Sequence, residues 1–407
     1  MTTTKNNEHK KLNAPNLRFP EFQGEWEEHY LSDYLDFKNG LNPKPDKFGK
    51  GIKFISVMDI LNNAIITNDC IRASVDVSEE ELQNFCVGYG DILFQRSSET
   101  LEDVGRANVY MDDKPAVFGG FVIRGKKKAE FNPLFFRDLL ASPFARKKII
   151  PMGAGAQHFN IGQEGLNKVK LNFPNLKEQE KIGRFLTLLD KRIATQSKVI
   201  EDLKKLKSAI INYAINSLDT DFAKFSSLYE MAGEGGTPTT SNASFYDNGK
   251  IPFIKIDDLK QKYLTENKDF ITELGLQKSS AWLVPTHSIL FSNGATIGEI
   301  SITTYPVCTK QGILGIVPKQ NIDVEFLYYF MSSSYFKKAV SRIVTEGTMK
   351  TAYLKDINNI RCPIPTKEKQ QEIAKMPSAL NSKIDFEQSI LKLFCSQKQY
   401  LLRQMFI

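Results

Sequence analysis

Two patterns of apolar residues alternate along the chain. Short runs rich in β-branched and aromatic residues, such as KFISV (53–57), DILF (91–94) and GGFVI (119–123), are bounded by Gly, Pro, Asn and Asp. They predict β-strands joined by turns. Comparable runs return as PFIKI (252–256), HSILF (287–291) and GILGIV (312–317). Each group precedes a short helical pattern, at 132–149 and 323–340, and then a long one, at about 177–216 and 366–406.

This order is a repeat. A shift of 191 residues places NPLFFRDLLASPFARKKI (132–149) on DVEFLYYFMSSSYFKKAV (323–340), and PNLKEQEKIGRFLTLLDKRI (174–193) on PTKEKQQEIAKMPSALNSKI (365–384), without a gap. Upstream, the shift is 197 where DILF meets SILF (288–291), and 199 where IKFISVMDI (52–60) meets IPFIKIDDL (251–259). Because chance similarity of two helices would not also align the strands in order, the sequence predicts a duplication.

The two long helices share an apolar seam with alternating steps of three and four residues, which is typical of coiled coils. The predicted seam consists of Ile182, Leu186, Leu189, Ile193, Ile200, Leu203 and Ile210, and of Ile373, Leu380, Ile384, Leu391, Phe394 and Leu401. We expect the helices to pair antiparallel within one chain; the alternative is that each packs on its own globule. Pro377, which replaces Leu186 in the repeat, predicts either a kink or a late start of the second helix.

The predicted fold class is α/β (α+β), with two repeated β-rich domains joined by two long helices in an antiparallel intramolecular coiled coil. The predicted segments are 1–25 (N-terminal tail), 26–172 (first domain), 173–217 (central helix), 218–362 (second domain) and 363–407 (C-terminal helix).

Composition narrows the classes of function. The 407 residues carry 54 basic and 47 acidic side chains, a net charge of +7 that suits basic groups focused on particular faces. Five cysteines without a CxxC pair argue against a disulfide framework, and the four histidines lack the spacing of a metal site. Since no apolar run approaches 18 residues and no signal peptide is evident, we expect a cytoplasmic protein with no membrane segment.

Motifs of catalysis are missing. There is no GxxxxGK[ST] loop and no convincing glycine-rich cofactor loop, and NPLF (132–135) departs from the NPPF-type segment of amino-methyltransferases at Leu134. A nuclease could be imagined from Asp46 with Asp112 and Lys114, but such triplets are common in a chain rich in lysine and aspartate. We therefore expect no catalytic residues and no metal site.

Basic and polar residues on predicted loops remain as candidates for DNA binding. Lysine and arginine supply contacts to phosphates, whereas Arg, Asn, Gln, Ser and Thr can reach base edges. The candidates are Lys44, Lys47, Lys50, Lys53, Arg96, Ser97, Ser98 and Arg106 in the first half, and Thr239, Thr240, Ser241, Lys255, Asn293, Thr296, Lys310 and Gln311 in the second.

The chain resembles the specificity subunits of bacterial Type I restriction-modification systems. The resemblance extends from residue 14 over nearly the whole chain, and its P-x-x-x-E-Q-x-x-I helix start is found at Pro174, Glu178, Gln179 and Ile182. APNLRFPEFQGEWEE (14–28), GDILF (90–94), FSNGATIGE (291–299) and PIPTKEKQQEI (363–373) are similar to the family as well. In the second copy Lys369 replaces the glutamate.

The resemblance implies that each β-rich domain is a target recognition domain reading one half of a bipartite, asymmetric site on double-stranded DNA, and that the helices set the spacer. It also implies two modification subunits, which use S-adenosylmethionine to methylate adenine, and two restriction subunits, which use ATP and magnesium to cleave DNA. No cofactor would then be bound by this chain itself, which would not be an enzyme alone. The alternatives are a coiled-coil scaffold that binds proteins and a self-contained nuclease or methyltransferase.

Overall fold

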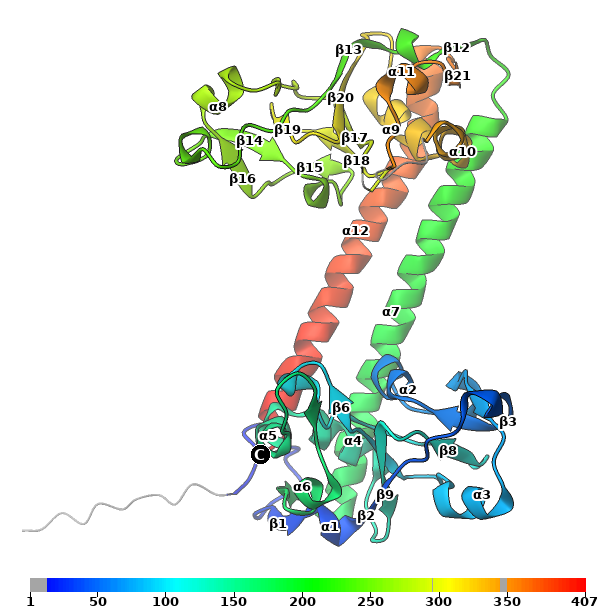
Figure 1. Ribbon diagram of the computed structural model, residues 1–407, viewed down its shortest axis with the longest axis vertical. Helices are drawn as coiled ribbons and strands as arrows, with labels where there is room; N and C mark the ends of the chain where they lie inside the picture. The colour runs from blue at the N-terminus through cyan, green and yellow to red at the C-terminus, as the bar shows by residue number, and fades with distance from the viewer. Residues whose placement is uncertain (1–12, 295, 345–349) are drawn as a thin grey trace, which may run out of the picture. The chain divides into compact units, whose positions relative to one another are not determined.

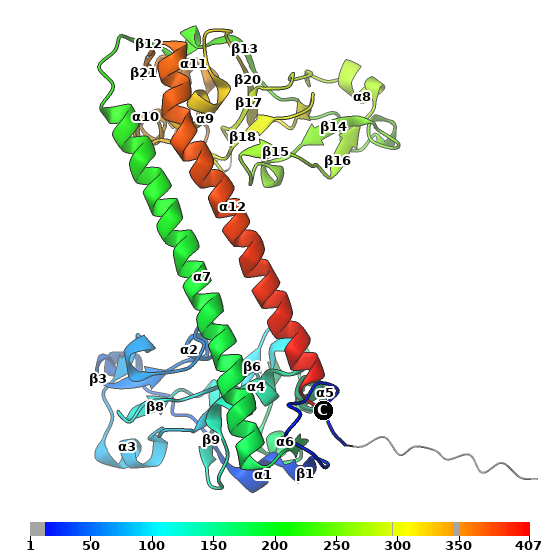
Figure 2. The same cartoon turned by 180° about the vertical axis from the view of Figure 1, so that it is seen from behind.

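The computed structural model describes residues 13–294, 296–344 and 350–407. Two compact units make up the chain: unit 1 comprises Met1–Ser197 with Ser389–Ile407, and unit 2 comprises Lys198–Gln388 (Figures 1 and 2). Each unit contains one β-rich globule and one part of each long helix. The limits of the five predicted segments stay predictions. Residues 1–12 of the predicted tail lie outside the described residues.

The globule of unit 1 contains a four-stranded sheet in the order β2-β9-β5-β7, a three-stranded sheet β4-β3-β8, and the pairs β1-β11 and β6-β10. The strands are β1 Glu27–Tyr30, β2 Leu35–Asn39, β3 Phe48–Ile55, β4 Ser74–Val75, β5 Ile92–Gln95, β6 Ser97–Ser98, β7 Ala107–Val109, β8 Ala116–Phe118, β9 Val122–Lys127, β10 Phe159–Asn160 and β11 Lys170–Phe173. The helices are α1 Leu31–Tyr34, α2 Val57–Asn62, α3 Glu79–Phe85, α4 Pro133–Ala141, α5 Pro143–Ile149 and α6 Gln163–Asn167.

Unit 2 contains a five-stranded sheet β13-β20-β17-β18-β15, a three-stranded sheet β16-β14-β19 and the pair β12-β21. The strands are β12 Phe222–Lys224, β13 Tyr229–Glu234, β14 Ile251–Ile254, β15 Tyr263–Leu264, β16 Asp269–Ile271, β17 Ile289–Ser292, β18 Ile300–Thr303, β19 Cys308–Thr309, β20 Ile313–Pro318 and β21 Arg361–Pro363. The helices are α8 Glu273–Gln277, α9 Val324–Ser332, α10 Ser334–Ile343 and α11 Leu354–Ile357.

The strand pairings confirm the duplicated fold. In unit 1, β3 runs parallel to β8 with Phe54 opposite Val117. In unit 2, β14 runs parallel to β19 with Phe253 opposite Cys308. These partners are related by the shifts of 199 and 191 residues found in the sequence. The sequence repeat is therefore also a repeat of sheet topology and of strand register.

The long helices are α7, Leu176–Asn216, and α12, Lys367–Gln404, within two residues of the predicted limits. Within unit 1, Lys398 of α12 forms an ion pair with Asp190 of α7, and the guanidinium of Arg192 lies over the ring of Phe394. Within unit 2, the ammonium of Lys207 donates to the Oδ1 of Asn381 at 2.9 Å. Because rising numbers on α7 meet falling numbers on α12, the predicted antiparallel pairing is confirmed (Figures 1 and 2).

The predicted seam is buried or half-buried along both helices. In unit 1 the seam is part of one hydrophobic core. There, Ile182, Leu186 and Leu189 of α7 cluster with Leu401 of α12 and with Met405, the residue that follows α12. Pairing between helices and packing on the globule therefore occur together and are not alternatives. The late start that Pro377 predicted for α12 is wrong, because the helix begins at Lys367 and runs through the buried Pro377.

Each short helical pattern, predicted as one helix, forms two helices. Ser142 ends α4 with an extended backbone and accepts a hydrogen bond from the N–H of Ala145 as the N-cap of α5. Ser333 does the same between α9 and α10, accepting from Phe336. Serine favours this capping conformation over a helix interior, and Pro143 cannot supply the N–H that a continuous helix needs.

A buried glutamine connects the long helix to the short helix in both units. The Oε1 of Gln179 accepts the N–H of Asn132 at 3.1 Å, and its Nε2 donates to the carbonyl of Pro174 at 2.9 Å. Gln370 makes the equivalent bonds to Asp323 at 2.8 Å and Pro365 at 2.9 Å. All partners are related by 191 residues. The glutamine thus satisfies backbone groups at the starts of both helices, which explains its place in the motif.

The glutamate before this glutamine has a role only in unit 1. Glu178 is fully buried and accepts two hydrogen bonds at 2.7 Å from Arg18 and one at 3.3 Å from the indole of Trp26. It therefore holds the segment that enters the first globule. The equivalent Lys369 is exposed and pairs with Glu372 on its own helix, so the ion pair at this position lies at the surface in unit 2.

Candidate nucleic-acid interface

Four loops converge in unit 1 at one end of the four-stranded sheet. The N–H of Arg96, after β5, donates to the carbonyl of Phe121, before β9, at 2.8 Å. The carbonyl of Arg96 accepts the N–H of Ile161 at 3.0 Å. Asn42, after β2, lies against Gly120, where a β-carbon would stand 2.0 Å from the Oδ1 of Asn42. We call Asn42, Arg96, Gly120, Phe121 and Ile161 the first loop frame.

The same convergence occurs in unit 2. The N–H of Asn293 donates to the carbonyl of Gly312 at 3.0 Å, and the carbonyl of Asn293 accepts the N–H of Ala352 at 2.9 Å. The N–H of Gln311 donates to the Oγ1 of Thr237 at 3.3 Å. We call Thr237, Asn293, Gln311, Gly312 and Ala352 the second loop frame. Each member is related to its counterpart by 191 to 197 residues, as in the sequence repeat.

Glycine allows the loops to approach so closely. A β-carbon on Gly40, at the start of the first frame, would lie 2.0 Å from the carbonyl oxygen of Gly119, and one on the equivalent Gly235 would lie 2.2 Å from that of Thr309. Both contacts are with backbone and cannot be relieved by a rotamer change. Backbone bonds and glycine therefore fix Arg96 and Asn293 in place independently of their side chains, whereas Asn42 and Thr237 join the frames through side-chain atoms.

The side chains carried by the two frames differ. Arg96 is half-buried and donates to the carbonyl of Gly120 at 3.2 Å, and next to it the ring of Phe121 is 69% exposed. In unit 2, Asn293 is 1% exposed and donates to the carbonyl of Ala352 at 3.2 Å, whereas Lys310 and Gln311 are exposed. One frame presents a guanidinium and an aromatic ring, and the other presents an ammonium and an amide.

The structure brings some of the predicted residues to the frames. Ser97 and Ser98, which follow Arg96, form β6 and pair with β10. Ser98 is buried. Thr239, Thr240 and Ser241 are exposed shortly after Thr237, and Thr296 is exposed shortly after Asn293. Arg106, which pairs with Asp103 at 2.7 Å, precedes β7 and lies beside the first frame, because its carbonyl accepts the N–H of Gln95.

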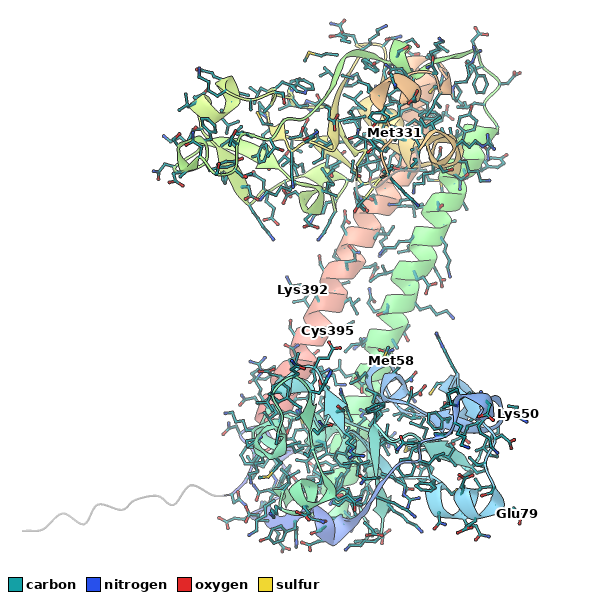
Figure 3. All side chains as sticks on the ribbon, in the orientation of Figure 1. Lys50, Met58, Glu79, Met331, Lys392 and Cys395 are labelled. Atoms are coloured by element: carbon teal, nitrogen blue, oxygen red, sulfur yellow. The ribbon has the colours of Figure 1, made fainter. Side chains whose placement is uncertain are left out.

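Of the remaining predicted lysines, Lys255 lies beside the second frame, because the carbonyl of the preceding Ile254 accepts the N–H of Lys310 at 2.9 Å, and the lysines of unit 1 lie elsewhere. Lys44, Lys47 and Lys50 are exposed around the start of β3, and Figure 3 shows Lys50 on the part of unit 1 remote from α7. Lys50 pairs with Asp76 at 3.2 Å. The ammonium of Lys53 donates to the carbonyl of Ile71 at 2.7 Å and supports the loop there. Lys255 pairs with Asp269 at 2.8 Å.

Sequence reasoning placed Thr237 in a candidate loop, TPTTSN (237–242), but missed Asn42 and Phe121. A polar residue in a loop carries no distinctive signal, and an exposed phenylalanine resembles a core residue of the strand that it precedes. The available signal was the repeat itself, because Asn42 aligns with Thr237 at a shift of 195 residues and Phe121 aligns with Gly312 at a shift of 191.

Neither a metal-binding cluster nor a membrane-spanning helix is found among the described residues. Over residues 13–294, 296–344 and 350–407, no group of three or more His, Cys, Asp or Glu side chains is arranged to hold a metal ion. Within the same ranges, no helix has the length and apolarity to cross a membrane.

A duplicated α/β chain, with two β-rich globules and an antiparallel helix pair, defines the class of fold. Residues 23–205 and 220–393 both match the family described as Type I restriction modification DNA specificity domain. The chain belongs to this family, and its role is DNA sequence specificity.

Relatives and solved structures agree with that assignment. The type I restriction enzyme MjaIX specificity subunit of Methanocaldococcus jannaschii is 32% identical over 173 residues, 41% of this chain and 39% of its own. The MjaVIII specificity subunit of the same organism is 22% identical over 399 residues, 91% of this chain and 89% of its own.

Among solved structures, the type I S subunit of M. genitalium has a TM-score of 0.57 at 15% identity, covering 97% of this chain and 99% of that one. A chain from a structure that addresses complex assembly of a type I R-M system has a TM-score of 0.58 at 14% identity, covering 93% of this chain and 96% of that one. These two likenesses support the fold.

Proposed function

We propose that the globules of units 1 and 2 each read one half of a bipartite, asymmetric site on double-stranded DNA. The observation that carries this proposal is the pair of loop frames. They have equivalent backbone hydrogen bonds but carry different side chains: the half-buried Arg96 with the exposed Phe121 in the first frame, and the exposed Gln311 with its neighbour Lys310 in the second. Arginine and lysine pair with guanine edges, glutamine with adenine, and an aromatic ring contacts the thymine methyl group or a base step. Two unlike readers in one chain suit a site without palindromic symmetry.

The chain in this proposal binds DNA and performs no reaction itself. Methylation of adenine would be done by two modification subunits that carry S-adenosylmethionine, and cleavage by two restriction subunits that use ATP and magnesium. The complex would act in the cytoplasm. The expected division of labour has a direct test: the purified chain with S-adenosylmethionine should methylate no DNA, and adding the modification subunit should produce methylation at a specific sequence.

One groove in each unit supports docking of two identical partners, and the two grooves overlap at repeat-related positions. In unit 1, Phe19, Phe185 and Leu188 line a groove of about 540 Å³ on α7. In unit 2, Tyr213, Ile373 and Met376 line one of about 550 Å³, and Met376 is equivalent to Phe185 by the shift of 191. We assign one modification subunit to each groove. Leu188→Glu and Met376→Glu should each remove one copy from the complex, as measured by native mass spectrometry.

The decisive experiment maps methylated adenines in the DNA of cells that express the chain with its modification partner. A bipartite sequence should appear. Arg96→Ala should relax or change only one half of it, and Gln311→Ala only the other half, whereas the matched surface change Lys114→Ala should alter neither. A single continuous site, or a change in both halves from one substitution, would contradict the proposal.

The spacer between the halves offers a second measurement. Because the seam repeats every seven residues, inserting four residues near residue 200 breaks its register. We expect the unread gap in the methylated sequence to change length, or the complex to fail to assemble. An unchanged gap in an assembled complex would show that the helices do not set it.

A further inference from the structure

A pocket of about 430 Å³ in unit 1 lies where α2, α4, α5 and β7 meet α7 and the end of α12. Its lining is unusually rich in charge. Four cations, Arg106, Arg137, Arg146 and Lys398, face it together with Asp138, Asp190 and Glu102.

The charges deep in the pocket neutralise each other. Arg137, with 7% of its side chain exposed, bonds to Asp138 and Asp190 at 2.7 Å each. Lys398 forms a second ion pair with Asp190. Burial raises the pKa of the Asp138 carboxyl, and Arg137 opposes that rise. These four residues therefore form a closed cluster that leaves no cation over.

Arg106 and Arg146, by contrast, differ in their partners. Arg106 pairs with Asp103 at 2.7 Å. Arg146 bonds only to backbone, donating from Nη2 to the carbonyls of Glu102 at 2.8 Å and Val104 at 2.6 Å, and its buried Nη1 has no hydrogen-bond partner. Burial, followed by the charge of Arg106, lowers the pKa of Arg146 to about 10. Of the two guanidinium groups that face the pocket, Arg106 therefore has a carboxylate partner, whereas Arg146 has none among the described residues.

The equivalent pocket of unit 2 differs at both arginine positions. Its volume is about 440 Å³, and it is lined by Glu299 and Lys337. Glu299 is the counterpart of Arg106, because its carbonyl accepts the N–H of Ser292 as that of Arg106 accepts the N–H of Gln95. Lys337 is the counterpart of Arg146 by the shift of 191. Glu299 and Lys337 of unit 2, which have opposite charges, thus correspond to Arg106 and Arg146 of unit 1, which have like charges.

We propose that Arg106 and Arg146 form a phosphate-binding site, and that its ligand is a backbone phosphate of the DNA duplex next to the half-site read by unit 1. A phosphate supplies a negative charge for Arg146, which has no ion pair among the described residues, and acceptor oxygens for its unpaired donor. The proposal rests on the proposed function, because the carbonyl of Arg106 is bonded to the N–H of Gln95, and Gln95 is the residue before Arg96 of the first loop frame. A free phosphate offers the same chemistry and is tested separately.

The test measures binding of the full chain to duplex DNA as a function of salt. Each phosphate contact contributes about 0.9 to the slope of log affinity against log salt concentration. Arg106→Gln should lower that slope by about 1 and weaken binding about 3- to 10-fold near 0.1 M salt, equally for target and non-target duplexes. Arg106→Glu, which copies unit 2, should weaken it further. Glu299→Gln is the matched control and should leave the slope unchanged or slightly higher.

Arg146→Lys is the second variant. It keeps the positive charge with fewer donors, so affinity should fall by less than in Arg106→Gln, and an unchanged urea midpoint excludes unfolding as the cause. An unchanged slope in Arg106→Gln would overturn the phosphate site. A change in which sequence is preferred would also overturn it, since Arg106 would then read a base. If the unaltered chain binds all duplexes equally, the proposed function is refuted. The phosphate site can still be tested in that case, because the salt slope can be measured on any duplex.

Inorganic phosphate distinguishes the two sources of the ligand. Phosphate should raise the melting temperature of the unaltered chain above that in chloride of equal ionic strength, and Arg106→Gln should lose the rise. If the rise is present while the slope for DNA is unchanged in Arg106→Gln, the site takes a free anion, and the assignment to DNA is wrong.

Discussion

Units 1 and 2 share a backbone and differ in the chemistry placed on it. The glutamines at 179 and 370 make the same bonds, and the loop frames have equivalent hydrogen bonds. Where the long helices meet the globules, unit 1 has Arg137, Asp138 and Asp190, and unit 2 has Tyr328, Tyr329 and Asn381 at the same positions. Duplication has preserved the residues that satisfy buried backbone groups, whereas side chains that pair with each other have changed together.

The largest expected effect comes from exchanging Glu178 and Lys369 between the copies. Glu178→Lys places an ammonium in a fully buried position beside Arg18, so the free energy of unfolding should fall by about 4 kcal/mol. Lys369→Glu affects an exposed residue and should change it by about 0.5 kcal/mol or less. Urea unfolding of both variants measures the contrast. Similar losses in the two would show that the copies do not differ as described.

A second exchange concerns the ion pairs. Asp190→Asn removes the carboxylate shared by Arg137 and Lys398 and should cost about 3 kcal/mol, because two largely buried cations lose a partner. The reciprocal Asn381→Asp gives Lys207 a carboxylate, and should be neutral or stabilise unit 2 slightly. Urea unfolding again provides the measurement. A neutral Asp190→Asn would mean that the unit 1 cluster contributes nothing to stability.

The glutamines should behave alike. Gln179→Leu and Gln370→Leu each leave one backbone N–H and one carbonyl without their partner, at a cost of about 2 kcal/mol in either unit. Gln371→Leu, on the exposed face of the same helix turn, is the matched control. Unequal losses from the two buried glutamines would break the proposed equivalence of the helix starts.

The smallest effect is a pH dependence that belongs to unit 2. Burial lowers the pKa of the Lys207 ammonium, which faces Asn381, Asp385, Lys204, Lys262 and Lys337. The folded state therefore holds this proton less tightly than the unfolded state, so Lys207 disfavours folding at low pH, and the penalty is relieved as pH rises from the folded pKa towards the ordinary lysine value. The melting temperature of the unaltered chain minus that of Lys207→Met should increase from pH 7 to about pH 10.4. A decrease in this difference in melting temperature would mean that folding raises the pKa of Lys207.

Much of the fold could be predicted from sequence because its signals are periodic and occur twice. The seam of α7 and α12, the paired strands and the glutamine motif all follow from spacing. The breaks at Ser142 and Ser333 were missed because an apolar pattern continues across a single capping residue. Part of the candidate interface was missed for another reason. Lys53 and Lys255 read as free loop charges, yet each is bound to its own globule, and only the folded chain brings Asn42 to Gly120.

Pro377 leaves one turn of α12 weaker than its neighbours, because it has no N–H to donate to the carbonyl of Ile373. The next residue, Ser378, is bonded to Glu325 of α9 and accepts a hydrogen bond from the buried Lys262 at 3.0 Å. Side chains of the second globule thus hold in place a helical turn that the backbone alone secures poorly. Amide hydrogens just before Pro377 are accordingly expected to exchange with solvent sooner than those before Leu186, and transient opening of the long helices should begin there.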